Sequence, residues 1–278
     1  MNKLECNAEL PTVSIVFPTR NRQDHLPAFL DCIYNLSYPK SLISIFTVVN
    51  DSLDDSEKIL YQFKKQHEHD YKQIYIKRVN LDTPTYDSNR YAIISPKIIQ
   101  SKHGQKTVPQ NDTHKVYKNL AKHRNSLMAK ADGDFCFSID TDIFCQPDTL
   151  KQLIAHNADY VSAHICNGFI VEKLNGARAY DFTNAMYFNE ELNKHVHYSY
   201  ETNRGLVECS NTGAVFCISK QAYRSGAKFD GHPIGEDYPF CKELTDRGFN
   251  LYCDTSIKCA HAMDLDLLEK YKSGNWTY

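Results

Sequence analysis

The chain opens with short apolar runs that alternate with amphipathic segments, and this alternation constrains the fold more than any other feature. The apolar runs have the length of buried strands and lie at residues 13–17, 43–49 and 74–79. The segments between them carry apolar side chains at helical spacing, as at Leu26, Phe29, Leu30 and Ile33. Strands that alternate with helices are typical of a parallel sheet with helices packed against it. The sequence therefore predicts an α/β fold.

A further apolar run, Phe135 to Ile139, leads into two aspartates that are one residue apart, Asp140 and Asp142. Its aromatic and β-branched residues predict a buried strand, whose carboxyl end is where open α/β sheets bind ligands. In an extended chain, residues i and i+2 point to the same side, so both carboxylates are expected to face one ion. Hard oxygen ligands suit Mg²⁺ or Mn²⁺, which usually bind together with substrate phosphates. The alternative interpretation is a solvated turn at a strand end.

The second half of the chain is less regular. Strands are predicted at residues 159–163, 214–219 and 250–254. A helix is expected to open at Gly235-Glu236-Asp237 and to run to Gly248, which stands where helices often end in glycine. Because the sequence shows neither a repeat nor a linker, residues 1–278 are expected to form one domain. Its regular half covers about residues 12–142, and its irregular half about residues 143–278.

Composition and charge narrow the classes of function. A formal net charge of −2 lacks the basic excess of nucleic-acid-binding proteins. The N-terminus has no apolar region like that of a signal peptide, and no apolar run is long enough to span a membrane. The ten cysteines include no C-x-x-C pair, so they are expected to be reduced thiols. These features predict a soluble, cytoplasmic protein that does not bind nucleic acid.

Four motifs resemble those of the family-two-like glycosyltransferases with the GT-A fold, and they occur along the chain in the order expected for that family. Residues 13–22 (VSIVFPTRNR) resemble the opening strand and loop, and residues 50–52 (NDS) stand where the family has an Asp-Asp-Gly-Ser strand end. Residues 121–142 resemble the helix, glycine turn and D-x-D strand, and Gly235-Glu236-Asp237 resembles the later Glu-Asp motif. The resemblance implies a Rossmann-like nucleotide-binding half, a mostly parallel central sheet flanked by helices, and an irregular acceptor-binding half.

The same resemblance implies an enzyme of the hexosyl- or deoxyhexosyltransferase class. Such an enzyme moves a sugar from a nucleotide-sugar, first a UDP-sugar and second a GDP-sugar, to a hydroxyl group of a carbohydrate or glycoconjugate. Mn²⁺ or Mg²⁺ would neutralise the charge of the diphosphate leaving group. Asp142 is the expected direct ligand, Asp140 meets the ribose or the metal shell, and His261 is the third ligand. For His261, a structural or solvent-facing role is the alternative.

The resemblance also assigns residues to the donor and to the chemistry. The expected donor contacts are Pro18, Thr19, Arg20, Asp51, Arg124, Asp140 and Thr141. Asp51 is expected to accept a hydrogen bond from a uracil N–H, with a turn or capping role as the alternative. Arg124 either faces the donor or packs its stem on the sheet. Asp237 is the expected general base of an inverting transfer and Glu236 an acceptor or structural contact, unless both carboxylates cap the helix.

Departures from the family pattern leave other interpretations open. Asn50 replaces a common Asp, and residues 81–114 form a long insertion that is expected to act as a mobile lid. Four tyrosines of the second half are expected either to stack on an acceptor sugar or to lie in the core, namely Tyr180, Tyr187, Tyr198 and Tyr200.

The competing functions are a retaining transferase on the same fold, a sugar nucleotidyltransferase and a non-catalytic sugar-nucleotide-binding module. The loop at residues 18–22 lacks glycine, which counts against a nucleotidyltransferase.

Overall fold

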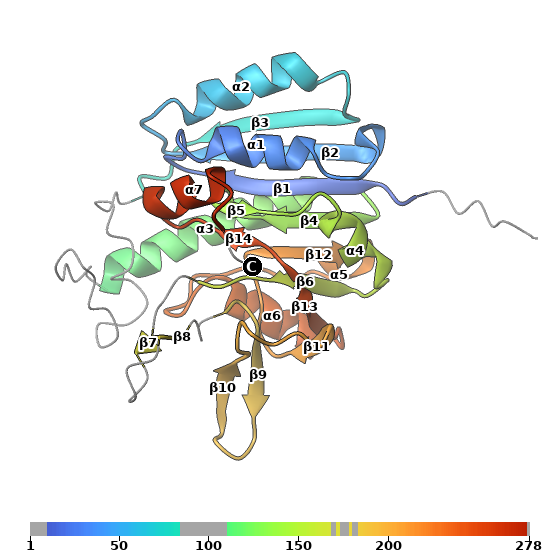
Figure 1. The fold of residues 1–278 in the computed structure, drawn as a ribbon, viewed down its shortest axis with the longest axis vertical. Coiled ribbons are helices and arrows are strands. Elements are labelled where there is room, and N and C mark those ends of the chain that lie inside the picture. The colour runs from blue at the N-terminus through green and yellow to red at the C-terminus, as the bar shows by residue number, and fades with distance from the viewer. Residues whose placement is uncertain (1–9, 84–109, 168–170, 173–177, 180–182, 277–278) are drawn as a thin grey trace, which may run out of the picture.

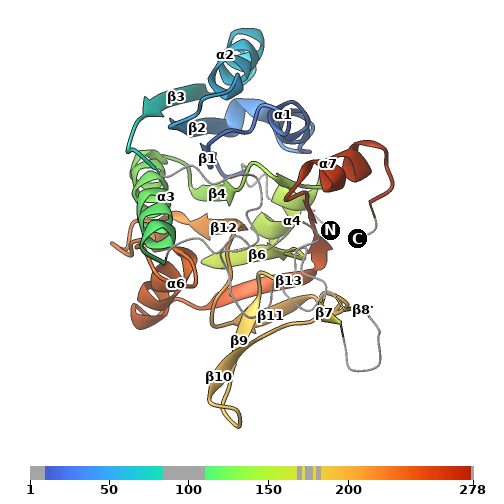
Figure 2. The same ribbon diagram turned by 90° about the vertical axis from the view of Figure 1, so that its left-hand side faces the viewer.

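An eight-stranded sheet in the order β11-β13-β6-β12-β4-β1-β2-β3 forms the centre of the molecule (Figures 1 and 2). The computed structural model describes residues 10–83, 110–167, 171–172, 178–179 and 183–276. The strands are β1 (Val13–Thr19), β2 (Ile43–Asn50), β3 (Gln73–Val79), β4 (Phe135–Ile139), β6 (Tyr160–His164), β11 (Leu206–Cys209), β12 (Val215–Ser219) and β13 (Leu251–Lys258). Strand β12 is antiparallel to both its neighbours and β11 to β13, whereas the other pairs in this sheet are parallel. The predicted α/β fold with a mostly parallel central sheet is confirmed.

Helices cover both faces of this sheet (Figure 2). One face carries α1 (Leu26–Tyr34), α4 (Thr149–Ala155) and α7 (Leu265–Lys272), with α2 (Ser56–His67) beside α1. The other face carries α3 (Gln110–Lys130) and α6 (Asp237–Asp246), and the short α5 (Lys220–Tyr223) follows β12. The buried apolar side chains accordingly fall into two clusters, one on each face. Within the described residues, no helix combines the length and apolar character needed to cross a membrane.

The second half of the chain also forms smaller, two-stranded sheets. They are β5 (Ile143–Phe144) with β14 (Ala260–His261), β7 (Val171–Glu172) with β8 (Arg178–Ala179), and β9 (Met186–Asn189) with β10 (Lys194–His197). The β9–β10 hairpin projects from the body of the molecule (Figure 2). Most of the insertion expected to act as a lid, residues 84–109, lies outside the described residues.

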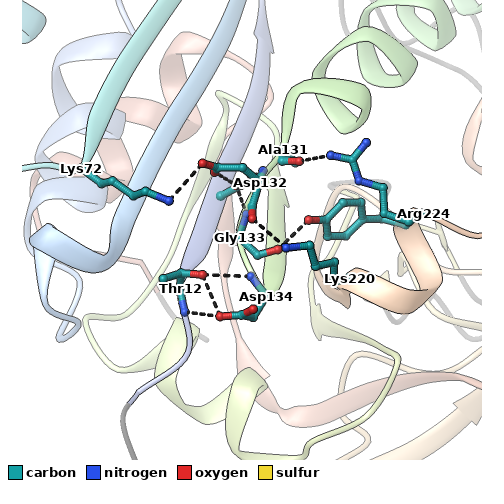
Figure 3. A network of polar contacts seen from close by, with 10 residues as sticks. Thr12, Lys72, Ala131, Asp132, Gly133, Asp134, Lys220 and Arg224 are labelled. Atoms are coloured by element: carbon teal, nitrogen blue, oxygen red, sulfur yellow. Dashed lines mark hydrogen bonds and ion pairs between the residues drawn. The ribbon is translucent and has the colours of Figure 1, made fainter.

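The turn between α3 and β4 is held tightly against the first strand (Figure 3). The backbone N–H and hydroxyl of Thr12 donate to Asp134 Oδ2 at 2.9 and 2.7 Å. The Lys72 ammonium donates to Asp132 Oδ2 at 3.0 Å, and the Tyr223 hydroxyl donates to the Gly133 carbonyl at 2.5 Å. A Cβ at Gly133 would lie 2.7 Å from a backbone nitrogen of β1, so glycine is required here. These contacts anchor the start of β4 and thereby fix where its carboxyl end lies.

The loops that follow β1, β2 and β4 meet at one edge of the sheet. The three strands are parallel neighbours, so their carboxyl ends lie side by side. Strand β12 starts at this same edge, because Val215 pairs with Ile139 at the end of β4. The connection that precedes β12 therefore lies close to the residues after β4. The predicted functional residues gather at this carboxyl edge.

Candidate active site

A buried arginine on α3 links two acidic residues from distant parts of the chain. Arg124 Nη2 donates to Asp140 Oδ1 at 2.7 Å, and Arg124 Nε donates to Glu236 Oε1 at 2.8 Å. The Arg124 side chain is 3% exposed, so its charge is compensated inside the protein rather than by water. The sequence left open whether Arg124 faces the donor or packs on the sheet. In the structure it joins the carboxyl end of β4 to the start of α6.

The chain turns directly after β4, so Asp140 and Asp142 meet different partners. The N–H of Ile143 donates to the carbonyl of Asp140 at 3.0 Å and closes the turn. The segment after β4 is therefore a turn rather than the extended chain that was expected, so strand alternation does not apply to Asp140 and Asp142, although their charges still interact. Asp140 pairs with Arg124, and Asp142 pairs with Arg22.

Asp142 lies between an arginine of the β1–α1 loop and a histidine of β14. Arg22 Nη2 forms an ion pair with Asp142 Oδ2, and the two side chains are 12% and 13% exposed. His261 Nε2 lies 3.7 Å from the other carboxylate oxygen, Asp142 Oδ1. The β5–β14 ladder places His261 there by pairing it with Ile143. The structure thus brings together two of the expected metal ligands. It adds Arg22, which was not assigned to the site although it belongs to the first motif.

Asp237 is the first residue of α6, and its carboxylate lies against Gly213 in the connection between β11 and β12. A Cβ at Gly213 would be 2.1 Å from Asp237 Oδ2, so only glycine leaves room for this carboxylate. Asp237 Oδ1 is buried and has no hydrogen-bond partner among the described residues. The neighbouring Glu236 occupies the N-cap position, but its side chain makes no cap hydrogen bond and pairs with Arg124 instead. The two adjacent carboxylates therefore have different surroundings.

Burial controls the protonation of these groups. It raises the pKa of Asp237 well above its ordinary value; the charge of Glu236 adds to this rise, and Arg124 opposes it. Burial also raises the pKa of Asp140, against the charge of Arg124. Burial lowers the pKa of His261, against the charge of Asp142. The His261 ring is therefore neutral near pH 7, and Asp237 binds a proton more readily than an ordinary aspartate does.

Asp51 and Arg20 hold the chain that follows β3. Asp51 Oδ1 accepts from the N–H of Leu81 at 3.0 Å, and Asp51 Oδ2 accepts from the N–H of Thr83 at 3.0 Å. Arg20 Nη2 donates to the Thr83 carbonyl at 2.6 Å. Burial raises the pKa of Asp51, but the hydrogen bonds from Thr83 and Leu81 outweigh it and lower the pKa overall. Both carboxylate oxygens are thus engaged by backbone amides, and a nucleobase contact would use their remaining lone pairs.

The other residues expected at the donor lie near the ends of β1 and β4. Pro18 pairs with Val48 in the β1–β2 ladder, and Thr19 Oγ1 lies 3.5 Å from Thr47 Oγ1. Thr141 is buried in the turn after β4. All three therefore lie at or beside the carboxyl edge that carries Asp140 and Asp142.

The groups around Asp142 suit a divalent cation that completes its shell with phosphate and water. A carboxylate oxygen and a neutral imidazole nitrogen face each other there, and both are ligands that Mn²⁺ accepts. Among the described residues, no group of three or more His, Cys, Asp or Glu side chains is arranged to hold a metal.

The aromatic side chain next to the two carboxylates of α6 is Tyr238, which was not among the tyrosines expected to stack on an acceptor. Its ring centroid lies 5.8 Å from that of His195 on β10 and 4.8 Å from that of His232. Tyr187 instead packs on Tyr198, with their centroids 4.8 Å apart. The expected Tyr180 lies outside the described residues. Sequence reasoning did not single out Tyr238, because the contact with His195 joins two distant segments of the chain.

Comparison with known proteins gives a family match over most of the chain. Residues 2–212 match the family model Anp1. Procollagen galactosyltransferase 1-A of Xenopus laevis is 25% identical over 162 residues, which are 57% of this chain and 24% of that protein. The chain thus spans about a quarter of the length of this curated relative.

Solved structures share the fold. The mannosyltransferase PcManGT from Pyrobaculum calidifontis, in complex with GDP-Man and Mn²⁺, superposes with a TM-score of 0.55 at 14% identity. That match covers 93% of this chain and 59% of the mannosyltransferase. S. aureus TarS 1–349 in complex with UDP-GlcNAc gives a TM-score of 0.51 at 14% identity, and it covers 89% of this chain and 57% of that one. These comparisons confirm the predicted GT-A fold and the predicted resemblance to nucleotide-sugar glycosyltransferases.

Proposed function

The chain belongs to the Anp1 family, and from this premise we propose that it is a metal-dependent glycosyltransferase. The proposed reaction moves a sugar from a nucleotide-sugar to a hydroxyl group of a carbohydrate or glycoconjugate. Its support includes the procollagen galactosyltransferase, the mannosyltransferase bound to GDP-Man and Mn²⁺, and TarS bound to UDP-GlcNAc. A UDP-sugar is the first proposed donor and a GDP-sugar the second.

The observation that carries this proposal is the group of carboxylates at the carboxyl edge of the sheet. It consists of Asp140, Asp142, Glu236 and Asp237. Arg124 pairs with Asp140 and Glu236, and Arg22 pairs with Asp142. Four carboxylates against two guanidinium groups give a formal excess of two negative charges when all four are ionised and of one when Asp237 is protonated, and a divalent cation would offset either. The same charge would otherwise repel the diphosphate of a donor, so a metal ion provides the missing attraction.

We assign the metal ion to Asp142 and His261, with Asp140 close by. When bound there, Mn²⁺ or Mg²⁺ would act as a Lewis acid that neutralises the charge on the leaving diphosphate. Arg124 holds Asp140 in place, and the hydrogen bond that closes the turn fixes the backbone of Asp140 relative to Asp142. The nucleotide would lie along the carboxyl ends of β1, β2 and β4 and the loops that follow them, where Thr19, Arg20, Asp51 and Thr141 are found.

Asp237 is the proposed general base of an inverting transfer. As the acceptor oxygen attacks the sugar carbon, the bond from that carbon to the diphosphate breaks, and the acceptor's hydroxyl proton passes to the carboxylate. The two carboxylates of α6 differ in a way that supports this role, because Glu236 is held by Arg124 whereas Asp237 Oδ1 has no partner among the described residues. Burial raises the pKa of Asp237, which makes its carboxylate a stronger base than that of an ordinary aspartate.

A donor panel tests the proposal and separates it from its alternatives. The protein is incubated with Mn²⁺ and either UDP- and GDP-sugars or, in parallel, nucleoside triphosphates with sugar phosphates, and the products are identified. Release of the nucleoside diphosphate supports a glycosyltransferase, release of pyrophosphate from a nucleoside triphosphate and a sugar phosphate supports a nucleotidyltransferase, and binding without turnover supports a binding module. The configuration of the product distinguishes inversion from retention.

Metal dependence is checked in the same assay. EDTA should abolish transfer, and added Mn²⁺ or Mg²⁺ should restore it. The variant Asp142→Ala should lose metal-supported nucleotide binding, while its circular-dichroism spectrum stays that of the wild type. Full activity in EDTA would overturn the metal assignment.

A further inference from the structure

The ion pair between Arg22 and Asp142 places a positive charge where the proposed metal ion would bind. Arg22 occupies Asp142 Oδ2, and His261 Nε2 faces Asp142 Oδ1 at 3.7 Å. Both members of the ion pair are largely buried, so solvent screens their charges only in part. A divalent cation at Asp142 would therefore meet the guanidinium at short range. A metal ion bound at Asp142 would thus compete with Arg22 for that carboxylate.

The backbone of Arg22 is fixed, so any adjustment must come from its side chain. The N–H of Arg22 donates to Ser56 Oγ at 2.7 Å, and the neighbouring N–H of Asn21 donates to Ser52 Oγ at 3.0 Å. The carbonyl of Arg22 accepts from the N–H of Leu26 at 2.8 Å. The loop is thus tied to the start of α2 and to the first turn of α1. The long side chain of Arg22, in contrast, can change rotamer while its loop stays in place.

We propose that Arg22 acts as an internal counter-ion that gives up Asp142 when the metal ion and the donor bind. Without ligands, its guanidinium neutralises Asp142. When a divalent cation takes over that carboxylate, the guanidinium pairs with the diphosphate of the nucleoside diphosphate portion of the donor. A planar guanidinium forms bidentate hydrogen bonds with phosphate oxygens. Arg22 therefore pairs with a negatively charged group both before and after the ligands bind. This inference rests on the proposed function and adds a residue that controls when metal and donor bind.

The proposal predicts opposite effects of one substitution on two ligands. In Arg22→Gln, the affinity for Mn²⁺ without nucleotide should rise about tenfold, because a unit charge about 6 Å from a divalent ion opposes its binding by about that factor even in water. Tenfold corresponds to about 1.4 kcal/mol. In the same variant, the affinity for UDP or GDP at saturating Mn²⁺ should fall about tenfold, since the guanidinium contact to the diphosphate is lost. Arg22→Lys keeps the charge and should change the Mn²⁺ affinity less than Arg22→Gln does.

Binding measurements on the full chain test this without any turnover. Mn²⁺ alone is titrated and its free form followed by electron paramagnetic resonance, and UDP and GDP are titrated at saturating Mn²⁺ by calorimetry. Arg247→Gln is the matched control, because Arg247 pairs with Glu243 and is 37% exposed. The control should match the wild type in both titrations. Thermal melting with and without Mn²⁺ shows whether Arg22→Gln is folded, and the folded variant should gain more stability from Mn²⁺ than the wild type does.

Each outcome decides one point. Unchanged or weaker Mn²⁺ binding by Arg22→Gln would overturn the competition, and would leave Arg22 as a support for Asp142. Tighter Mn²⁺ binding with unchanged UDP and GDP binding would overturn the transfer of the guanidinium to the diphosphate. A wild-type protein that binds neither Mn²⁺ nor either nucleotide would overturn the proposed function itself, and this inference with it.

Discussion

Replacing Gly213 with alanine tests whether the position of the Asp237 carboxylate matters for sugar transfer. The added Cβ would lie 2.1 Å from Asp237 Oδ2 and 2.4 Å from Asp237 Cγ, whereas ordinary van der Waals contact begins at 3.4 Å. Restoring a separation of 3.4 Å requires Oδ2, now 2.1 Å away, to move by 1.3 Å and Cγ, now 2.4 Å away, to move by 1.0 Å, so the carboxylate must withdraw by about 1 Å. The backbone of Gly213 is not in the left-handed region, so alanine is otherwise compatible with this position. The substitution therefore moves the proposed base with little other change.

The expected loss of activity follows from that displacement. A misplacement of about 1 Å at a reacting group costs about 10²-fold in rate, or about 2.7 kcal/mol of transition-state stabilisation. We expect the kcat of Gly213→Ala to fall by about this factor, while the affinity for the donor stays near that of the wild type. Release of nucleoside diphosphate at saturating donor and acceptor measures kcat, and calorimetric titration measures donor affinity.

Two controls sharpen this test. Gly248→Ala changes a glycine at φ +84 whose added Cβ meets nothing within 4 Å. Because a residue with a Cβ is strained at this φ, the variant should lose about 1 kcal/mol of stability and keep its turnover. In an Asp237→Asn background, Gly213→Ala should cause no further loss, because both substitutions act on the same group. The reasoning is refuted if Gly213→Ala alone retains a kcat within about threefold of the wild type. It is equally refuted if the same loss appears in both backgrounds.

Further substitutions separate chemistry from folding. Asp237→Asn should lower kcat by about 10²- to 10⁴-fold with unchanged donor affinity, since it removes the proposed base, and near-normal turnover would exclude Asp237 from that role. Glu236→Gln should chiefly lower stability, by about 3 kcal/mol, because it breaks the buried ion pair with Arg124. Thermal melting measures this loss. If Glu236→Gln instead loses turnover with an unchanged melting temperature, Glu236 rather than Asp237 is the base. Gly133→Ala should prevent stable folding, because its Cβ would meet Ser14 N at 2.7 Å. A variant with wild-type denaturant unfolding would contradict the packing of that turn.

Most of the strands and several helices of this protein follow from local sequence pattern. The apolar run at residues 13–17 becomes β1, the run at 43–49 becomes β2 and the run at 135–139 becomes β4, with ends that differ by two residues at most. Alternation of strands and helices was enough to predict a parallel sheet, because a right-handed crossover leaves few other arrangements. The helix α7 was missed, since its apolar positions come after the last recognised motif and cover only a short segment.

The candidate site was predicted residue by residue but not as a set of contacts. Asp140 and Asp142 were identified because two carboxylates follow a predicted buried strand, whereas Glu236 and Asp237 were assigned through the resemblance to the Glu-Asp motif of the GT-A family. Their partners were not, because the pairing of Arg22 with Asp142 joins residues 120 positions apart. The turn after β4 was given only as the alternative to an extended segment, because Asp-Thr-Asp is compatible with both a strand and a turn.

The sequence by itself determined the elements and the kinds of functional groups, because apolar periodicity and the chemistry of a side chain are local properties. The tertiary structure alone decided which charge meets which. It placed Arg124 between Asp140 and Glu236, left Asp237 against Gly213, and brought His261 to Asp142 through a two-residue strand pair. Coulomb interactions and burial depend on distance in space, which is set only once the sheet has aligned the ends of its strands.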